Sequence, residues 1–151
     1  MRKSILFVLL ASLLLNACNS VGEIEAHEAW ARPAMTGSND AVYFLLHNHT
    51  LQDDELVSAS SNVAEAVELH KSMAGADDTM QMVMQPSVPL PAGAELEFAP
   101  GGLHIMLIGL KQDLRAGDQF VVTLHFKNYK DIVLQVHVQE NAGMNMDHSA
   151  P

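Results

Sequence analysis

The sequence predicts an all-β protein with a single domain, arranged as a β-sandwich or barrel. The chain has 151 residues, which is a typical length for one domain. Short runs of alternating apolar and polar residues recur along it, and several such runs at regular spacing are typical of β-sandwiches. No segment keeps an amphipathic helical period for more than ten residues.

The expected strands follow one another along most of the chain. The alternation is clearest near the C-terminus, where Val122 and Leu124 alternate with Val121 and Thr123. Clusters of Gly, Pro, Asn and Asp favour tight turns, and they separate several of the runs, at 36–40, 89–93, 100–102 and 116–118. The nine expected strands are 24–32, 41–48, 55–60, 66–70, 80–84, 94–98, 103–109, 119–126 and 132–138.

The N-terminus has the features of an export signal. Arg2 and Lys3 precede an apolar run at 5–15, which is too short to span a membrane as a helix and fits a signal peptide. The run ends in Leu-Asn-Ala-Cys, which resembles a bacterial lipoprotein signal and implies lipid attachment to the thiol of Cys18. The alternative is ordinary cleavage that leaves a free cysteine. We therefore expect an exported protein that a lipid anchors to the extracytoplasmic side of a membrane.

These signals divide the chain into four expected parts. Residues 1–17 are the lipoprotein signal peptide, and residues 18–22 are a tether. Residues 23–139 form the β-sandwich domain. The last residues, 140–151, lack a strand pattern and are expected to form a flexible tail that carries Met and His.

Composition excludes several classes of function. The chain has 8 Lys and Arg against 18 Asp and Glu, a net charge of −10, so nucleic acid is an unsuitable partner. Cys18 is the only cysteine, so the chain can form neither an internal disulfide nor a blue-copper site, which needs a thiolate inside the fold. Ser-His-Asp order, zinc motifs and phosphate-binding loops are absent from the sequence. We therefore expect a protein that is not an enzyme.

Histidine and methionine residues indicate a copper site. His104 and Met106 are two residues apart in an expected strand, so their side chains share one face. Imidazole and thioether together favour the soft ion Cu(I). Because only the imidazoles must lose a proton to bind, binding should weaken below about pH 6. Further ligands of the same kind are available in two other expected strands, namely His70, Met80, Met82 and Met84.

Several segments resemble the PCu(A)C family of periplasmic copper chaperones. They are Val67-Glu68-Leu69-His70, the Met-rich strand before Pro86, Leu90-Pro91-Ala92-Gly93 and the glycine-rich segment 100–110. The resemblance extends over residues 21–138. It implies a cupredoxin-like Greek-key β-sandwich that binds Cu(I) through two His and two Met. It also implies a role in delivering copper to the CuA centre of cytochrome c oxidase.

The family pattern is His, ten residues, Met, twenty-one residues, His, one residue, Met. His70, His104 and Met106 match it directly. Met82 is separated from His104 by 21 residues, as in the pattern, but from His70 by 11. Met84 is separated from His104 by 19. The resemblance therefore implies the ligand set His70, Met82, His104 and Met106, and it leaves as alternative or auxiliary ligands Met84, Met80, Met73 and, in the tail, Met144, Met146 and His148.

The predicted function is that of a Cu(I) metallochaperone outside the cytoplasm. It would pass copper by ligand exchange from an exposed site to the CuA subunit of the oxidase or to another copper chaperone. The tail could also capture Cu(I) or Cu(II). Two alternatives remain open: a copper-scavenging lipoprotein without an oxidase acceptor, and a metal-free interaction module on a membrane anchor in which Met fills core space.

Overall fold

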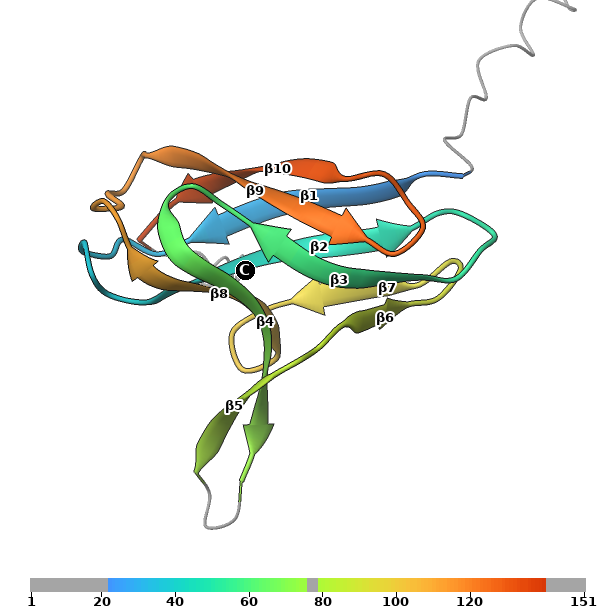
Figure 1. The fold of residues 1–151 in the computed structure, drawn as a ribbon, viewed down its shortest axis with the longest axis horizontal. Helices are drawn as coiled ribbons and strands as arrows, with labels where there is room; N and C mark the ends of the chain where they lie inside the picture. The colour runs from blue at the N-terminus through green and yellow to red at the C-terminus, as the bar shows by residue number, and fades with distance from the viewer. Residues whose placement is uncertain (1–21, 76–78, 141–151) are drawn as a thin grey trace, which may run out of the picture.

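The computed structural model describes residues 22–75 and 79–140, and within them it contains only strands and their connections. The predicted signal peptide, Cys18 and residues 141–151 of the predicted tail lie outside the described residues. Figure 1 shows the arrangement of the ten strands. They are β1 Ile24–Ala31, β2 Asp40–Asn48, β3 Asp54–Ser60, β4 Ala64–Ala74, β5 Met80–Met84, β6 Val88–Leu90, β7 Glu95–Phe98, β8 Leu103–Leu110, β9 Gln119–Phe126 and β10 Ile132–Val138.

All ten strands belong to one continuous sheet. Its order is β5-β4-β8-β7-β2-β1-β10-β9-β3-β6, and β8 also pairs with β2. The β1–β10 and β7–β8 pairs are parallel, whereas the other pairs are antiparallel. The sheet wraps around a single interior, and the β4–β5 hairpin projects from this body (Figure 1). The described residues hold no helix that could cross a membrane.

Alternation along the strands explains the core. In β2, Val42, Phe44 and Leu46 are buried, because every second side chain points to the inner face. Phe44 stacks on Phe98 of β7 with ring centroids 4.2 Å apart. Equivalent alternating residues of β8, β9 and β10 complete one cluster of buried apolar side chains. The predicted all-β class is therefore confirmed.

The nine predicted segments all form strands, and two features differ from the prediction. β6 was not predicted, because it is only three residues long and has Pro89 at its centre. Pro89 lacks an N–H, and the strand lies at the sheet edge, where proline is tolerated. β4 is longer than the predicted 66–70, because its first part pairs with β8 and its last part extends beside β5.

Asn48 is a fully buried polar residue at the end of β2. Its side-chain amide nitrogen donates to the carbonyl oxygens of Gln52, Leu90 and Pro91 at 2.9, 3.1 and 3.1 Å. Its side-chain oxygen accepts from the backbone N–H of Thr50 at 2.9 Å. One side chain thus joins the segment after β2 to the segment that ends β6.

Candidate metal centre

Three neighbouring strands bring the predicted ligands to one face of the sheet. In the register of β4 with β8, His70 lies opposite His104, and Glu68 lies opposite Met106. In the register of β4 with β5, Met84 lies opposite His70. Opposite residues of antiparallel strands share a face. The two imidazoles and the thioethers of Met84 and Met106 therefore lie on the same outer face.

The inner face of the same strands anchors them to the core. Leu69 of β4 and Ile105 of β8 are buried and lie opposite each other. Val67 also packs against the core. This confirms the expectation that Val67 and Leu69 point inward while His70 points away from them. Core packing of the residues between the ligands thus fixes which way the ligands point.

The turn before β8 positions His104. Gly101 has a φ of 81°, which favours glycine, and the backbone then turns into β8. The carbonyl oxygen of Gly102 accepts hydrogen bonds from the backbone N–H of Ser72 at 3.0 Å and from Nδ1 of His104 at 3.1 Å. Because Nδ1 donates its proton there, the lone pair of the neutral His104 ring is on Nε2. That Nε2 is buried and has no hydrogen-bond partner.

His70 is oriented by a different partner. Its Nε2 lies 2.8 Å from a carboxylate oxygen of Glu68. A carboxylate only accepts hydrogen bonds, so Nε2 carries the proton and the lone pair of the neutral ring is on Nδ1. This Nδ1 is also buried without a hydrogen-bond partner. The His70 side chain is 14% exposed.

The two neighbouring rings each leave one nitrogen lone pair without a partner. The ring centroids of His70 and His104 are 5.9 Å apart. Buried polar atoms nearly always have a partner, because an unpaired one costs about 1–3 kcal/mol. Two such atoms on neighbouring rings have the chemistry needed to hold a metal ion between them.

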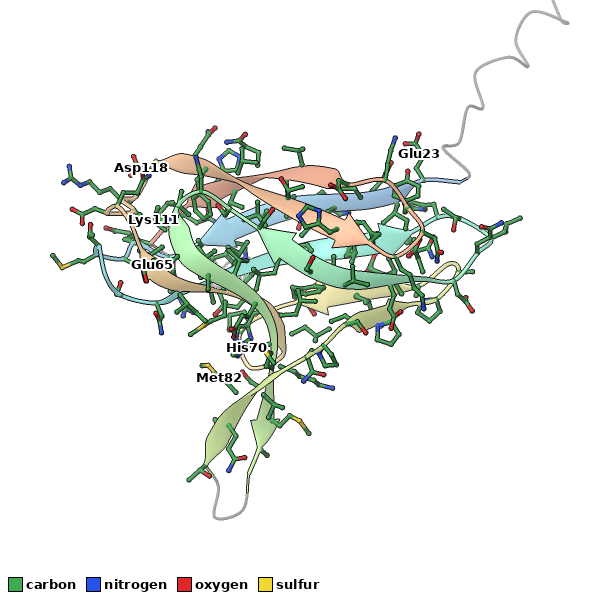
Figure 2. All side chains as sticks on the ribbon, in the orientation of Figure 1. Glu23, Glu65, His70, Met82, Lys111 and Asp118 are labelled. Carbon is green, nitrogen blue, oxygen red and sulfur yellow. The ribbon has the colours of Figure 1, made fainter. Side chains whose placement is uncertain are left out.

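Thioethers lie beside this pair of imidazoles. Met106 is half-buried on β8, and the Met residues of β5 are well exposed, at 62% for Met80, 61% for Met82 and 59% for Met84. Figure 2 shows Met82 on the projecting hairpin just beyond His70. Because the three β5 residues alternate along the strand, their side chains share the face of His70, with Met84 first, Met82 next and Met80 farthest toward the tip.

Met73 does not join this group. It lies opposite Gln81 in the β4–β5 pair, whereas its neighbour Ser72 lies opposite Met82. Successive strand residues point to opposite faces. Met73 therefore points away from the face that carries His70, and its expected role as an auxiliary ligand there has no support from the register.

Aromatic side chains close the other side of His104. The Tyr43 ring lies 6.3 Å from the His104 ring and 4.5 Å from the Trp30 ring, measured between centroids. The guanidinium of Arg32 lies over both aromatic rings. Burial raises the pKa of Tyr43 above its ordinary value. Tyr43 therefore lies beside the imidazole, and Trp30 and Arg32 pack in turn on Tyr43.

The burial of His104 corrects one expectation. The sequence predicted an exposed His/Met site, but His104 is only 2% exposed. Burial lowers the pKa of His104, and the nearby His70 lowers it further, while the hydrogen bond to Gly102 opposes them. Burial therefore favours the neutral form of the ring, which is the form that can bind a metal. The thioethers on the projecting hairpin are the most exposed of the proposed ligands, whereas His70 and Met106 are only partly exposed.

Sequence reasoning missed three residues that shape this centre, namely Glu68, Gly102 and Tyr43. Glu68 had a readable signal, since it is two residues from His70 and so shares its face. Tyr43 had none, because its contact with His104 depends on the pairing of β2 with β8.

Comparison with known proteins supports a family assignment. The family model described as "Putative lipoprotein LpqE-like" matches residues 24–138. A protein named as a putative lipoprotein from Leifsonia xyli subsp. xyli is 32% identical over 126 residues, which are 83% of this chain and 75% of that protein. A protein of Rickettsia prowazekii, named as uncharacterized, is 31% identical over 124 residues, or 78% of this chain and 67% of that protein.

Solved structures share the fold. The copper-bound PCuAC domain of PmoF2 superposes with a TM-score of 0.66 at 23% identity, covering 80% of this chain and 96% of that domain. DR1885 of Deinococcus radiodurans, determined with Cu(I), gives 0.61 at 26% identity and covers 87% of each chain. The predicted cupredoxin-like fold is thus confirmed. The chain belongs to the LpqE-like family of putative lipoproteins and has the fold of PCuAC domains.

Proposed function

We propose that this protein is a Cu(I) metallochaperone that works outside the cytoplasm, as PCu(A)C proteins do. The observation that carries the proposal is the pair of unpartnered nitrogens, Nδ1 of His70 and Nε2 of His104, on rings 5.9 Å apart. Two similar structures, the PmoF2 domain and DR1885, were determined with copper and with Cu(I). Their likeness supports copper as the metal that this chain carries.

The proposed ligand set is His70, His104, Met106 and a thioether from β5. Met84 lies directly opposite His70, and Met82 is next on the same face with the family spacing to His104. Both thioethers are therefore candidates for the fourth position. Two imidazoles with two thioethers suit Cu(I), whereas carboxylates and other hard ligands would suit other ions.

The unequal exposure of these ligands suits transfer by ligand exchange. The His104 ring is buried and held by a backbone carbonyl, so it can keep copper in place. The β5 thioethers are exposed and uncharged, so an acceptor's ligands can replace them one at a time. This exchange needs no catalytic group, in keeping with a role that is not enzymatic.

The proposed acceptor is the CuA centre of cytochrome c oxidase or another copper chaperone. A lipid on Cys18 would hold the protein at the extracytoplasmic membrane surface, where that centre would be within reach. The names of the family and of the Leifsonia protein support a lipoprotein. Met144, Met146 and His148 lie outside the described residues, and we propose them as a further capture site for Cu(I) or Cu(II).

A transfer assay tests this function. The Cu(I)-loaded protein is mixed with a metal-free CuA domain, the two are separated, and copper is measured in each. We expect copper to move to the CuA domain from the wild type. Retention of all copper by a protein that binds Cu(I) tightly would contradict delivery and favour a copper-scavenging role.

A further inference from the structure

The carboxylate of Glu68 contacts a proposed ligand but is not itself in the ligand set. Its oxygen lies 2.8 Å from Nε2 of His70. We infer that Glu68 is a positioning residue, which holds the His70 ring with Nδ1 toward the copper and strengthens binding through its negative charge. This inference rests on the proposed function and concerns the same site.

The local geometry makes the contact a direct result of strand structure. Glu68 and His70 are two residues apart in β4, so both side chains lie on the outer face. The register also places Glu68 opposite Met106 and His70 opposite His104. The carboxylate therefore lies beside the ligands and on the far side of the His70 ring from the unpartnered Nδ1.

A carboxylate in this position has a known effect on a metal ligand. An imidazole that donates its second N–H to a carboxylate has a fixed tautomer and orientation, and it becomes a stronger donor to the metal. Removing such an outer partner lowers metal affinity by about 10–100-fold in other proteins. We expect the same range here, because Glu68 holds the Nε2 side of the His70 ring while its Nδ1 has no hydrogen-bond partner within the described residues.

The two proposed imidazole ligands differ in the partner that accepts their second N–H. His104 donates to the Gly102 carbonyl, a neutral partner that side-chain substitution cannot remove. His70 donates to a charged side chain that is about one-third exposed.

A nearby negative charge also stabilises Cu(II) more than Cu(I), since the ion with the greater charge is attracted more strongly. Glu68 should therefore influence both the affinity and the reduction potential of the bound copper.

A series of substitutions separates orientation from charge. Glu68→Gln keeps an oxygen that can accept a hydrogen bond from Nε2–H of His70 but removes the charge, whereas Glu68→Ala removes both. Glu65→Gln is the matched control, because Glu65 lies on the same strand and the change in charge is the same. We expect Cu(I) affinity, measured by chelator competition on the full chain, to fall by about tenfold in Glu68→Gln and by up to about 100-fold in Glu68→Ala.

Two further measurements distinguish positioning from a merely structural role. The reduction potential of bound copper should rise in Glu68→Gln and stay unchanged in Glu65→Gln. In the metal-free protein, nitrogen-15 NMR should detect a slowly exchanging Nε2–H of His70 in the wild type and in Glu68→Gln, but not in Glu68→Ala.

The outcomes separate this inference from the proposed function. A wild type that fails to bind Cu(I) would overturn the proposed function, while the NMR result would still decide whether Glu68 holds the ring. Copper affinity and potential that are equal in Glu68→Ala and Glu65→Gln would overturn the inference and leave the proposed function intact.

Discussion

His70 on β4 lies directly opposite His104 on β8, with ring centroids 5.9 Å apart. One nitrogen of each ring is occupied, by Glu68 for His70 and by the Gly102 carbonyl for His104. The remaining nitrogen of each ring is buried and unpartnered. The sheet register thus brings the two proposed imidazole ligands together, although 33 residues lie between them in the sequence.

Met82 and Met84 of β5 should be able to replace each other, in part, as copper ligands. Met82 and Met84 share one face beside His70 and are both exposed. Replacing either one with Leu keeps the apolar volume and leaves the other thioether available. We therefore expect each single variant to bind Cu(I) within about tenfold of the wild type and the double variant to bind far more weakly. Chelator competition provides the measurement.

Met73→Leu is the control for that series, because Met73 points to the opposite face of the same hairpin. It should leave Cu(I) affinity unchanged. A double variant at positions 82 and 84 that binds as tightly as Met73→Leu would show that neither Met82 nor Met84 is needed as a ligand.

Acid should destabilise the metal-free protein through His104. Burial lowers the pKa of His104 below its ordinary value of 6.5. A lowered pKa means that the native state favours the neutral ring, so this stability is present above about pH 6.5 and is lost as the pH falls through the lower native pKa. Urea unfolding at pH 7.5 and pH 5 should show a smaller pH dependence in His104→Phe than in the wild type. Equal pH dependence in both would contradict this account.

Asp40 should affect the pH dependence of stability in the opposite direction to His104. Burial raises the pKa of Asp40 to about 6, and one of its carboxylate oxygens is buried without a partner. The stability linked to the protonated form is fully present below about pH 3.8 and is lost as the pH rises through about 6. Asp40→Asn should therefore stabilise the protein at pH 7.5 by about 1 kcal/mol, after allowance for partial exposure, and by less at pH 4. A variant that is less stable than the wild type at pH 7.5 would show this reasoning to be wrong.

Substitution of Asn48 should lower the free energy of unfolding more than substitution of most other polar residues. Replacement with Ala leaves one buried and two partly buried carbonyl oxygens without their donor, which should cost about 3 kcal/mol of unfolding free energy. Asn48→Asp should cost more, because a negative charge would then face the carbonyls of Gln52, Leu90 and Pro91. Asn39→Ala, which removes an exposed hydrogen bond to Gly109, should cost less than about 1 kcal/mol. Denaturant unfolding of the three variants checks this order.

Alternation in the sequence predicted most of the fold. It identified β8 and the face shared by His104 and Met106, because side-chain direction in a strand depends only on position along it. It did not predict β6, whose three residues around Pro89 are too short to show a period. It also placed His104 in an exposed site, because the Tyr43 and His70 rings that cover it come from other strands.

The family spacing and the strand register favour different residues as the fourth copper ligand. Spacing to His104 favours Met82, whereas pairing with His70 favours Met84. The sequence could not show that both face the site, because this depends on where the β4–β5 hairpin turns. The hairpin register supplies that information, and the Met82 and Met84 variants test it.

The most direct test of a His/Met copper site is a Cu(I) titration of the full chain against a chromogenic Cu(I) chelator. It compares the wild type with the double variant His104→Ala, Met106→Ala and with His137→Ala, which replaces an exposed histidine on β10. We predict that the wild type and His137→Ala compete for one equivalent of Cu(I) that the double variant cannot hold. A wild type that competes no better than the double variant would contradict the copper site.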